Sequence, residues 1–475
     1  MAESDVAAKV RELLRASFEF EPTSGQDQFI SSFSRYAAKE EEGIFLLRGY
    51  AGTGKTTVLS AISRTFKNIV LLAPTGRAAK VLSQYTNRPA YTIHKHLYRP
   101  AQTSDGRMML ALSDNSYRRT LFIVDEASMI PDAAIDDTTS PFPGVNLLHD
   151  LLRYVFSAPG CKLLMVGDTA QLPPVHFDNS PALDANHLRL KYRRPVTEIE
   201  LTEVVRQKEA SGILKNATAL RMLISRNAKE PILKSEGFAD VIRLSPRDTP
   251  ELLPQLYRKY GDNEVLVITR SNKSAIQYNR LIRFHHFWME EEIGAGDTLM
   301  IVKNNYTWIP ADHKAGFLAN GEVVKVRKIV RFEERYGMRF ATAILEIPDY
   351  PDDIPFEATL MLDTLSSEAP ALSNDVQNKF YKAVHDYYEL EEPNKRKRSE
   401  LIRADPYYNA LQVKFSYAVT CHKAQGGQWS AVVVDQGYLP PEMEGVEFLR
   451  WLYTAFTRAT RELYLVNFED RFFKV

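Results

Sequence analysis

The 475-residue sequence has little of what marks secreted or membrane proteins. Its only two cysteines, Cys161 and Cys421, lack the spacing of a metal site, so a reducing, cytoplasmic compartment is expected. No apolar run approaches the length of a membrane span, and the N-terminal segment carries a helical stripe of apolar residues among charges instead of a signal peptide. We therefore expect no membrane partner.

A charge of one sign is also missing, since 60 basic and 60 acidic side chains cancel. The net charge therefore does not indicate any class of partner. A surface that binds nucleic acid would have to be a local groove on a neutral molecule. Low-complexity tracts and short repeats are absent. The composition, 44% hydrophobic and 25% charged, is typical of a globular protein, and the length suggests two to four domains.

Two parts of the chain alternate short apolar runs with helical patterns, which predicts an α/β fold with parallel sheets. Between them, roughly 293–362, a β-like alternation with a turn signal at Asn320-Gly321 predicts a small inserted β-barrel. A charged helical stretch, interrupted by Pro393, follows it. The expected strands of the two sheets are 44–47, 69–73, 121–125 and 163–167 in the first, and 265–269, 431–435 and 463–466 in the second.

The stretch GYAGTGKT, from Gly49 to Thr56, lies between an apolar strand and a helical pattern, the context that a phosphate-binding loop requires. Glycines let backbone N–H groups turn towards phosphates, and the helix N-terminus adds positive potential. Lys55 would reach the β- and γ-phosphates, and Thr56 would ligate Mg²⁺. The predicted ATP contacts here are Gly52, Thr53, Gly54, Lys55, Thr56 and Thr57.

Acidic and amide side chains follow the later strands of the first sheet. Asp125 is expected to hold Mg²⁺ and Glu126 to act as general base on the attacking water. Gln171 could sense the γ-phosphate; the alternative is a loop amide beside Pro173-Pro174. Positive charge over that phosphate would come from Arg206 and Arg458, unless these are ordinary solvated side chains.

These stretches, with APTGRAA (73–79), TCHKAQGGQ (420–428) and YTAFTRA (453–459), resemble the RecD/Dda-like branch of the superfamily 1 helicases, which is related to the Pif-type helicases. The resemblance covers most of the chain. It implies two RecA-like motor domains, a duplex-splitting β-hairpin in the first and an SH3-like barrel with a helical extension in the second. The corresponding boundaries are 1–205 with the hairpin at about 97–118, 206–292 with 411–475, and 293–410 for the barrel and helices.

The resemblance also assigns residues outside the phosphate loop. Gln26 matches a glutamine that reads adenine, and Gln428 stands where the family commonly has a glutamate near the ribose, so altered sugar discrimination is expected. Tyr98 is a candidate tip or support of the hairpin. The predicted single-strand path comprises Pro74, Thr75, His94, Lys95, Thr420, His422 and Lys423, with Trp429 as a further candidate for base stacking.

The leading hypothesis is an ATP-dependent DNA helicase that acts as a monomer on single strands and single/double-strand junctions, 5′→3′ by resemblance. Two alternatives remain. One is a nucleic-acid-stimulated ATPase switch that clamps a strand without processive unwinding. The other is an RNA-directed motor of the same superfamily, which the 2′-hydroxyl would distinguish.

Overall fold

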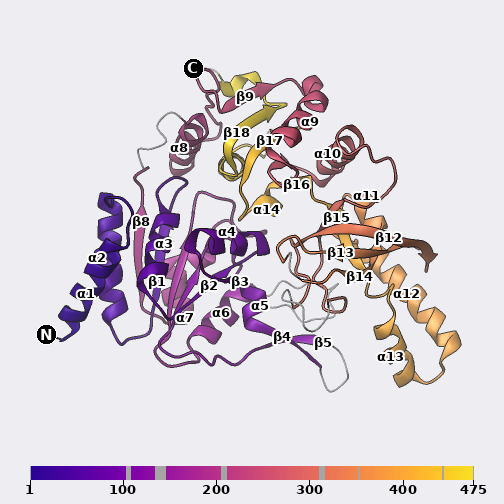
Figure 1. Cartoon of the computed structure of the whole chain (residues 1–475), viewed down its shortest axis with the longest axis horizontal. Coiled ribbons are helices and arrows are strands. Elements are labelled where there is room, and N and C mark those ends of the chain that lie inside the picture. The colour runs from indigo at the N-terminus through magenta and orange to yellow at the C-terminus, as the bar shows by residue number, and fades with distance from the viewer. Residues whose placement is uncertain are drawn as a thin grey trace. The chain divides into compact units, whose positions relative to one another are not determined.

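The computed structural model describes residues 2–102, 108–133, 146–204, 211–309, 316–350, 353–440 and 443–473. They form two compact units (Figure 1). Unit 1 draws on Met1–Arg243, Ala424–Ser430 and Tyr438–Val475, and unit 2 on Leu244–Lys423 and Ala431–Gly437. These units rest on compactness, whereas the predicted domain boundaries rest on sheet membership, so the units by themselves do not test those boundaries.

Unit 1 contains a six-stranded sheet in the order β3-β2-β6-β7-β1-β8. Every neighbouring pair is parallel, which confirms the predicted sheet. The carboxyl ends of its strands therefore meet at one edge, where α/β proteins bind ligands. The strands are β1 (Ile44–Gly49), β2 (Ile69–Ala73), β3 (Ala90–Thr92), β6 (Leu121–Val124), β7 (Lys162–Gly167) and β8 (Val196–Leu201).

Helices cover both faces of this sheet, so its central strands are apolar along their length. In β1, Ile44 and Leu46 join one buried cluster while Phe45 and Leu47 join another. The helices of this part of the chain are α1 (Ala2–Ala16), α2 (Ser24–Ala38), α3 (Lys55–Thr65), α4 (Gly76–Thr86), α5 (Ile93–Leu97), α6 (Leu147–Val155), α7 (Ala185–Tyr192) and α8 (Gly212–Ser225). No helix of the described residues is long and apolar enough to cross a membrane.

The predicted hairpin is present between α5 and β6. Strands β4 (Tyr98–Gln102) and β5 (Met108–Leu112) pair antiparallel, with Tyr98 opposite Leu112. The tip, 103–107, lies outside the described residues. Tyr98 is buried, and its hydroxyl donates to Asp150 Oδ2 at 2.8 Å. Of its two predicted roles, this position suits the support of the hairpin base.

A second sheet has the order β16-β10-β17-β18-β9. All three strands expected from the sequence belong to it, and β10 pairs parallel with both of its neighbours. Its strands are β9 (Val241–Leu244), β10 (Val265–Thr269), β16 (Ala418–Thr420), β17 (Trp429–Asp435) and β18 (Ala459–Val466). The nearby helices are α9 (Thr249–Tyr260), α10 (Asn272–His285), α14 (Cys421–Ala424) and α15 (Val446–Phe456).

The inserted barrel is confirmed as a closed barrel of five strands. They are β11 (Thr298–Ile301), β12 (Val323–Arg335), β13 (Met338–Glu346), β14 (Phe356–Met361) and β15 (Leu411–Phe415). The barrel runs past the predicted limit at residue 410, because β15 pairs antiparallel with β11 and parallel with β14 and so closes the ring. Without β15 two strand edges would be left open.

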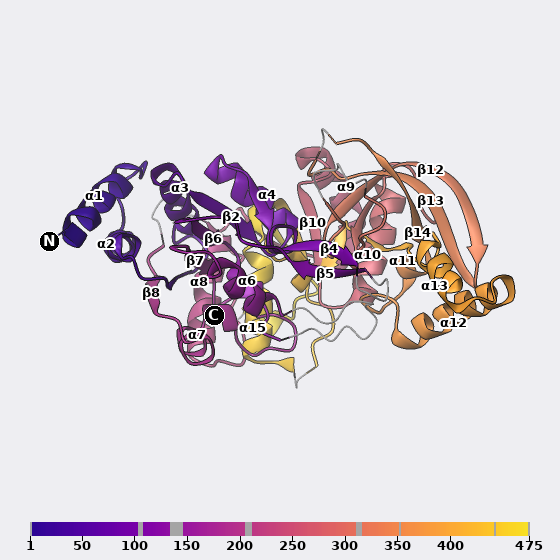
Figure 2. The ribbon, with the colours of Figure 1, turned by 90° about the horizontal axis from the view of Figure 1, so that it is seen from below.

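The predicted helical extension lies between β14 and β15. It consists of α11 (Asp363–Ser366), α12 (Asn374–Glu391) and α13 (Lys395–Ala404), and the break between the last two contains Pro393. Figure 2 shows α12 and α13 beside the barrel strands. Phe380 and Val384 of α12 pack there against Phe340 of β13 and Met361 of β14.

A buried ion pair joins α10 to the start of the barrel. Arg283 donates from Nε to Asp297 Oδ1 at 2.8 Å and from Nη2 to Oδ2 at 2.9 Å. The two side chains are 7% and 0% exposed. Asp297 also accepts from the hydroxyl of Tyr417 at 3.1 Å. Both carboxylate oxygens therefore have hydrogen-bond donors within unit 2.

Replacing Asp297 with alanine should lower the free energy of unfolding by about 3–5 kcal/mol, because a buried guanidinium loses its counter-charge. Urea denaturation of the variant and the parent measures this. The matched control is Glu346→Gln, whose partner Arg327 is 59% exposed; it should cost less than about 1 kcal/mol. Equal losses in the two variants would contradict the structural role of the buried pair.

Candidate nucleotide-hydrolysis site

The predicted phosphate loop connects the end of β1 to the start of α3. Gly52 has φ +77° and Gly54, which caps α3, has φ +86°, a backbone region that only glycine adopts readily. A Cβ on Gly52 would also lie 2.8 Å from Leu214 Cδ1. Thr53 is buried and its hydroxyl donates to Tyr50 O at 2.8 Å, which fixes the turn.

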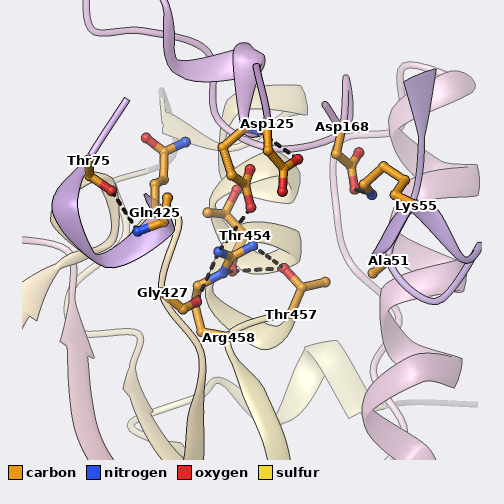
Figure 3. Close-up of polar contacts among 12 residues, drawn as sticks. Ala51, Lys55, Thr75, Asp125, Asp168, Gln425, Gly427, Thr454, Thr457 and Arg458 are labelled. Atoms are coloured by element: carbon orange, nitrogen blue, oxygen red, sulfur yellow. Dashed lines mark hydrogen bonds and ion pairs between the residues drawn. The ribbon is translucent and has the colours of Figure 1, made fainter. Parts of the chain in front are cut away.

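Lys55 is held by groups that phosphate oxygens can replace. Its ammonium donates to the carbonyl oxygens of Gly49 at 2.6 Å and Tyr50 at 3.1 Å. It also lies 3.9 Å from Asp168 Oδ2, and Figure 3 shows these two side chains facing each other. Thr56 is exposed in the first turn of α3, with Thr57 beside it, so its hydroxyl is accessible to a metal ion.

Asp125 and Glu126 follow β6 at the same sheet edge. Asp125 accepts from the Glu126 N–H at 2.9 Å and from the hydroxyl of Tyr85 on α4. Burial, and then the charge of Glu126, raises the pKa of Asp125 to about 6. Glu126 has φ +51°, a costly conformation for a residue with a side chain, and such outliers cluster at functional sites. Both carboxylates fit their predicted roles beside a metal-bound triphosphate.

Gln171 carries a buried polar atom without a partner. The side chain is 5% exposed, and its Oε1 accepts no hydrogen bond from any described residue. A buried amide oxygen without a protein donor is uncommon, and this one is available to accept a hydrogen bond from a bound group. The orphaned oxygen therefore fits a nucleotide-dependent contact better than an idle loop amide.

Arg458 reaches the same group of residues from the segment after α15 (Figure 3). Its guanidinium donates to Thr454 O and Gly427 O, both at 3.1 Å, and Nη1 lies 3.9 Å from Glu126 Oε1. The side chain is 4% exposed, which rules out the alternative of a solvated arginine. Arg206, the second predicted arginine, lies outside the described residues.

The two glutamines assigned by resemblance differ in exposure. Gln26 is buried at the start of α2, where its Oε1 accepts from the Thr23 N–H at 3.0 Å in a capping box. This leaves the Nε2 amide as the donor for a base, and the adenine contact stays a prediction. Gln428 is exposed, and its backbone oxygen accepts from Arg77 at 3.1 Å. Trp429 is covered by that guanidinium, 4.0 Å from the ring centroid, and offers no open face for stacking.

The predicted strand-binding residues of unit 1 follow the ends of β2 and β3. Pro74 and Thr75 lie between β2 and α4, and the Thr75 hydroxyl accepts from the Ala78 N–H at 3.2 Å. His94 and Lys95 lie on α5. Burial lowers the pKa of His94 to about 4, so its imidazole is neutral at physiological pH. The imidazole can stack on a base or hydrogen-bond to a nucleic-acid strand, but it brings no positive charge.

The predicted strand-binding residues of unit 2 lie at the end of β16 and in α14. Thr420 and Lys423 line a recess beside α10 that Lys414 also lines, while His422 lies between them in α14. Burial lowers the pKa of Lys423, and that of Lys414, to about 8. Because no carboxylate is among the residues that line the recess, it suits a phosphate group.

Some contributors to the site were not predicted. Asp168 stands three residues before Gln171 in the stretch GDTAQLPP (167–174), but nothing in its spacing separates it from a loop acid. Tyr85 gives no sequence signal, since an aromatic near the end of a helix is ordinarily core. Their roles follow only from where the sheet brings them.

Two family models match this chain. One, described as an AAA domain, covers residues 24–229, and the other, described as a UvrD-like helicase C-terminal domain, covers 415–466. Among solved structures, that of Pif1 helicase from Bacteroides in complex with ADP-AlF3 and ssDNA is 16% identical over 96% of this chain and 95% of that chain, with a TM-score of 0.46.

Relatives of similar sequence come from a bacterium, a phage and a giant virus. The ATP-dependent RecD2 DNA helicase of Deinococcus radiodurans is 26% identical over 99% of this chain, which spans only 53% of the relative. The ATP-dependent DNA helicase dda of Enterobacteria phage T4 is 25% identical over 65% of this chain and 66% of its own length. An uncharacterized protein of Acanthamoeba polyphaga mimivirus is 25% identical over 88% of this chain and 94% of its own length.

Glu126→Gln should lower the single-turnover rate of ATP hydrolysis by about 10²–10⁴-fold, because the amide cannot take a proton from water. The amide keeps the shape of the side chain, so nucleotide affinity, measured with a fluorescent ATP analogue, should change little. A variant that hydrolyses ATP at the parent rate would remove Glu126 from the role of general base.

Single-strand affinity should fall as the pH rises from 7 to 9, because Lys423 loses its charge above its pKa of about 8. Fluorescence anisotropy with a labelled oligonucleotide measures the effect. Lys423→Met should bind more weakly, and the residual pH dependence should then report Lys414, the other titrating lysine of the recess. Lys423→Arg should restore affinity at pH 9. A pH profile unaltered in Lys423→Met would exclude a phosphate contact by this residue.

Proposed function

The chain belongs to the RecD/Dda-like branch of the superfamily 1 helicases and is an ATP hydrolase, and from this premise we propose that it moves along single-stranded DNA and separates the duplex ahead of it. The direction 5′→3′ and action as a monomer are parts of the proposal. DNA is favoured as substrate because the curated relatives with assigned activities are named DNA helicases.

One observation carries the hydrolytic half of the proposal. Lys55, Glu126 and Arg458 converge at one edge of a parallel sheet, together with the orphaned Oε1 of Gln171. A cation for the phosphates, a base for water, an amide to orient that water and a buried guanidinium are the groups that phosphoryl transfer requires.

Each residue then has a definite task. Lys55 exchanges its loop carbonyls for phosphate oxygens, and Arg458 stabilises the negative charge that spreads over the transferred phosphoryl group. Glu126 takes the proton of the attacking water, so the products are ADP and inorganic phosphate. Mg²⁺, for which Thr56 and Asp125 are the fitting ligands, would neutralise charge on the β- and γ-phosphates.

The strand-binding half rests on features of each unit taken separately. Unit 1 offers the Thr75 hydroxyl after β2 and the neutral imidazole of His94 after β3. Unit 2 offers a recess with two lysines after β16. Neutral stacking groups combined with a few cations suit a strand that must be held and released without base preference. The β4–β5 hairpin is the proposed splitting element.

A duplex with a 5′ single-stranded tail should be unwound in the presence of ATP, whereas a 3′-tailed duplex should not. Strand displacement, followed by fluorescence, measures this on the full chain. Lys55→Ala should abolish both hydrolysis and unwinding while leaving strand affinity largely intact, because only the phosphate contact is lost.

The outcomes separate the candidate functions. Strand-stimulated hydrolysis without displacement on either tail would contradict unwinding and identify a clamping switch. Stronger stimulation by RNA than by a matched DNA oligonucleotide would redirect the proposal to RNA. Replacing Asp105 to Leu110 by a tight turn should impair unwinding but preserve stimulated hydrolysis if the hairpin splits the duplex.

A further inference from the structure

Two adjacent side chains of α15 contact the loops around the nucleotide site and belong to none of the roles above. Tyr453 and Thr454 are 1% and 0% exposed, so neither is a surface residue. Most of α15 is buried, from Phe448 to Phe456, and the helix leads directly into Arg458. The hydroxyl groups of Tyr453 and Thr454 are therefore buried in the protein interior.

Tyr453 joins three elements through one oxygen atom. Its hydroxyl donates to Asp168 Oδ2 at 2.6 Å and accepts from the Ala51 N–H at 2.8 Å. Asp168 follows β7 and faces Lys55, and Ala51 belongs to the phosphate loop. Burial, and then the charge of Asp168, raises the pKa of Tyr453 well above its usual value, so the phenol stays protonated and continues to donate.

Thr454 contacts the other end of the segment that begins at Asp168. Its hydroxyl accepts from the Leu172 N–H at 2.8 Å, and Leu172 O accepts from Gln425 Nε2 at 2.7 Å. The carbonyl oxygen of Thr454 accepts from Arg458 Nε at 3.1 Å. One residue thus fixes the position that follows Gln171 and also holds the arginine.

The segment from Asp168 to Leu172 is consequently anchored at both ends by neighbouring residues of one helix. Gln171 lies between the anchors, and its Oε1 has no partner among the described residues. Its place is therefore set by the ends of the segment and not by a hydrogen bond of its own oxygen. The same helix sets the place of Arg458.

We propose that Tyr453 and Thr454 are positioning residues for ATP hydrolysis, which keep the phosphate loop, Gln171 and Arg458 in one arrangement around the γ-phosphate. The inference rests on the proposed hydrolytic function and deepens it. Neither residue touches the reacting atoms. Since a displacement of about 1 Å can cost about 100-fold in rate, loss of either anchor affects turnover more than nucleotide binding.

The test uses three substitutions in the full chain. Tyr453→Phe keeps the buried ring and removes both hydrogen bonds, and Thr454→Val keeps the shape and removes the acceptor for Leu172. We expect kcat of strand-stimulated ATP hydrolysis to fall about 10- to 100-fold, with KM for ATP within about threefold of the parent. Thr454→Ser, which retains the hydroxyl, should recover most of kcat.

Tyr36→Phe is the matched control. The hydroxyl of Tyr36 is also buried and contacts Gly43 O at 2.8 Å and Leu163 O at 3.0 Å. These contacts lie at the amino ends of β1 and β7, away from the edge that carries the site. This variant should lose stability, measured by thermal denaturation, and keep the parent kcat.

The results distinguish the inference from the function on which it rests. A parent protein that does not hydrolyse ATP in the presence of a single strand refutes the function itself. A parent that hydrolyses ATP, with unchanged kcat in Tyr453→Phe and Thr454→Val, overturns the inference, as does a change in KM alone. If Tyr453→Phe does not fold, the comparison of Thr454→Val with Thr454→Ser decides.

Discussion

Parallel pairing of β6, β7 and β1 brings the carboxyl ends of three strands to one edge of the sheet in unit 1. The phosphate loop, the Asp168 segment and the Asp125-Glu126 pair occupy that edge as a direct result. An antiparallel neighbour would send its functional end to the opposite edge. The position of β7 between the other two strands places Asp168 beside Lys55 and makes the Gln171 segment the link between the phosphate loop and the acidic pair.

Buried charge gives this edge its chemical capacity. Asp168 is 1% exposed and Arg458 is 4% exposed, and burial raises the pKa of Asp168. Arg458 bonds to carbonyl oxygens and a hydroxyl, while the nearest carboxylate oxygen, on Glu126, remains 3.9 Å away. Its positive charge is thus only partly compensated and acts in a medium of low dielectric constant. Such a preorganised cation costs little reorganisation when negative charge develops beside it.

The sequence predicted the parts of the fold that local patterns encode. The strands at 69–73 and 265–269 have the predicted limits, because each is a largely apolar run bounded by polar residues or proline. The phosphate loop was predictable for the same reason, as its glycines, lysine and threonine are contiguous. The predicted limit at residue 410 places LQVKF in the second motor domain. Only the pairing of β15 with β11 and β14 reveals that this segment belongs to the barrel.

Contacts over long sequence separations account for the rest of the site. Tyr453 and Asp168 are 285 residues apart, and Leu172 and Thr454 are 282 apart, so no local pattern relates them. The interpretation of Trp429 as a stacking surface failed for a similar reason: Arg77, far away in the chain, covers the ring. The neutral state of the His94 imidazole could not be anticipated either, since it depends on burial and not on the adjacent residues in the sequence.

The parallel pairing of β14 with β15 has a topological consequence for α11, α12 and α13. Two adjacent parallel strands cannot be joined by a tight turn, because the chain must return the full length of the strand before it can run beside it again. The helices between β14 and β15 are that return path. They are therefore part of what makes the ring of strands geometrically attainable: the helices could be replaced by another connection, but a connection that returns the length of a strand must remain.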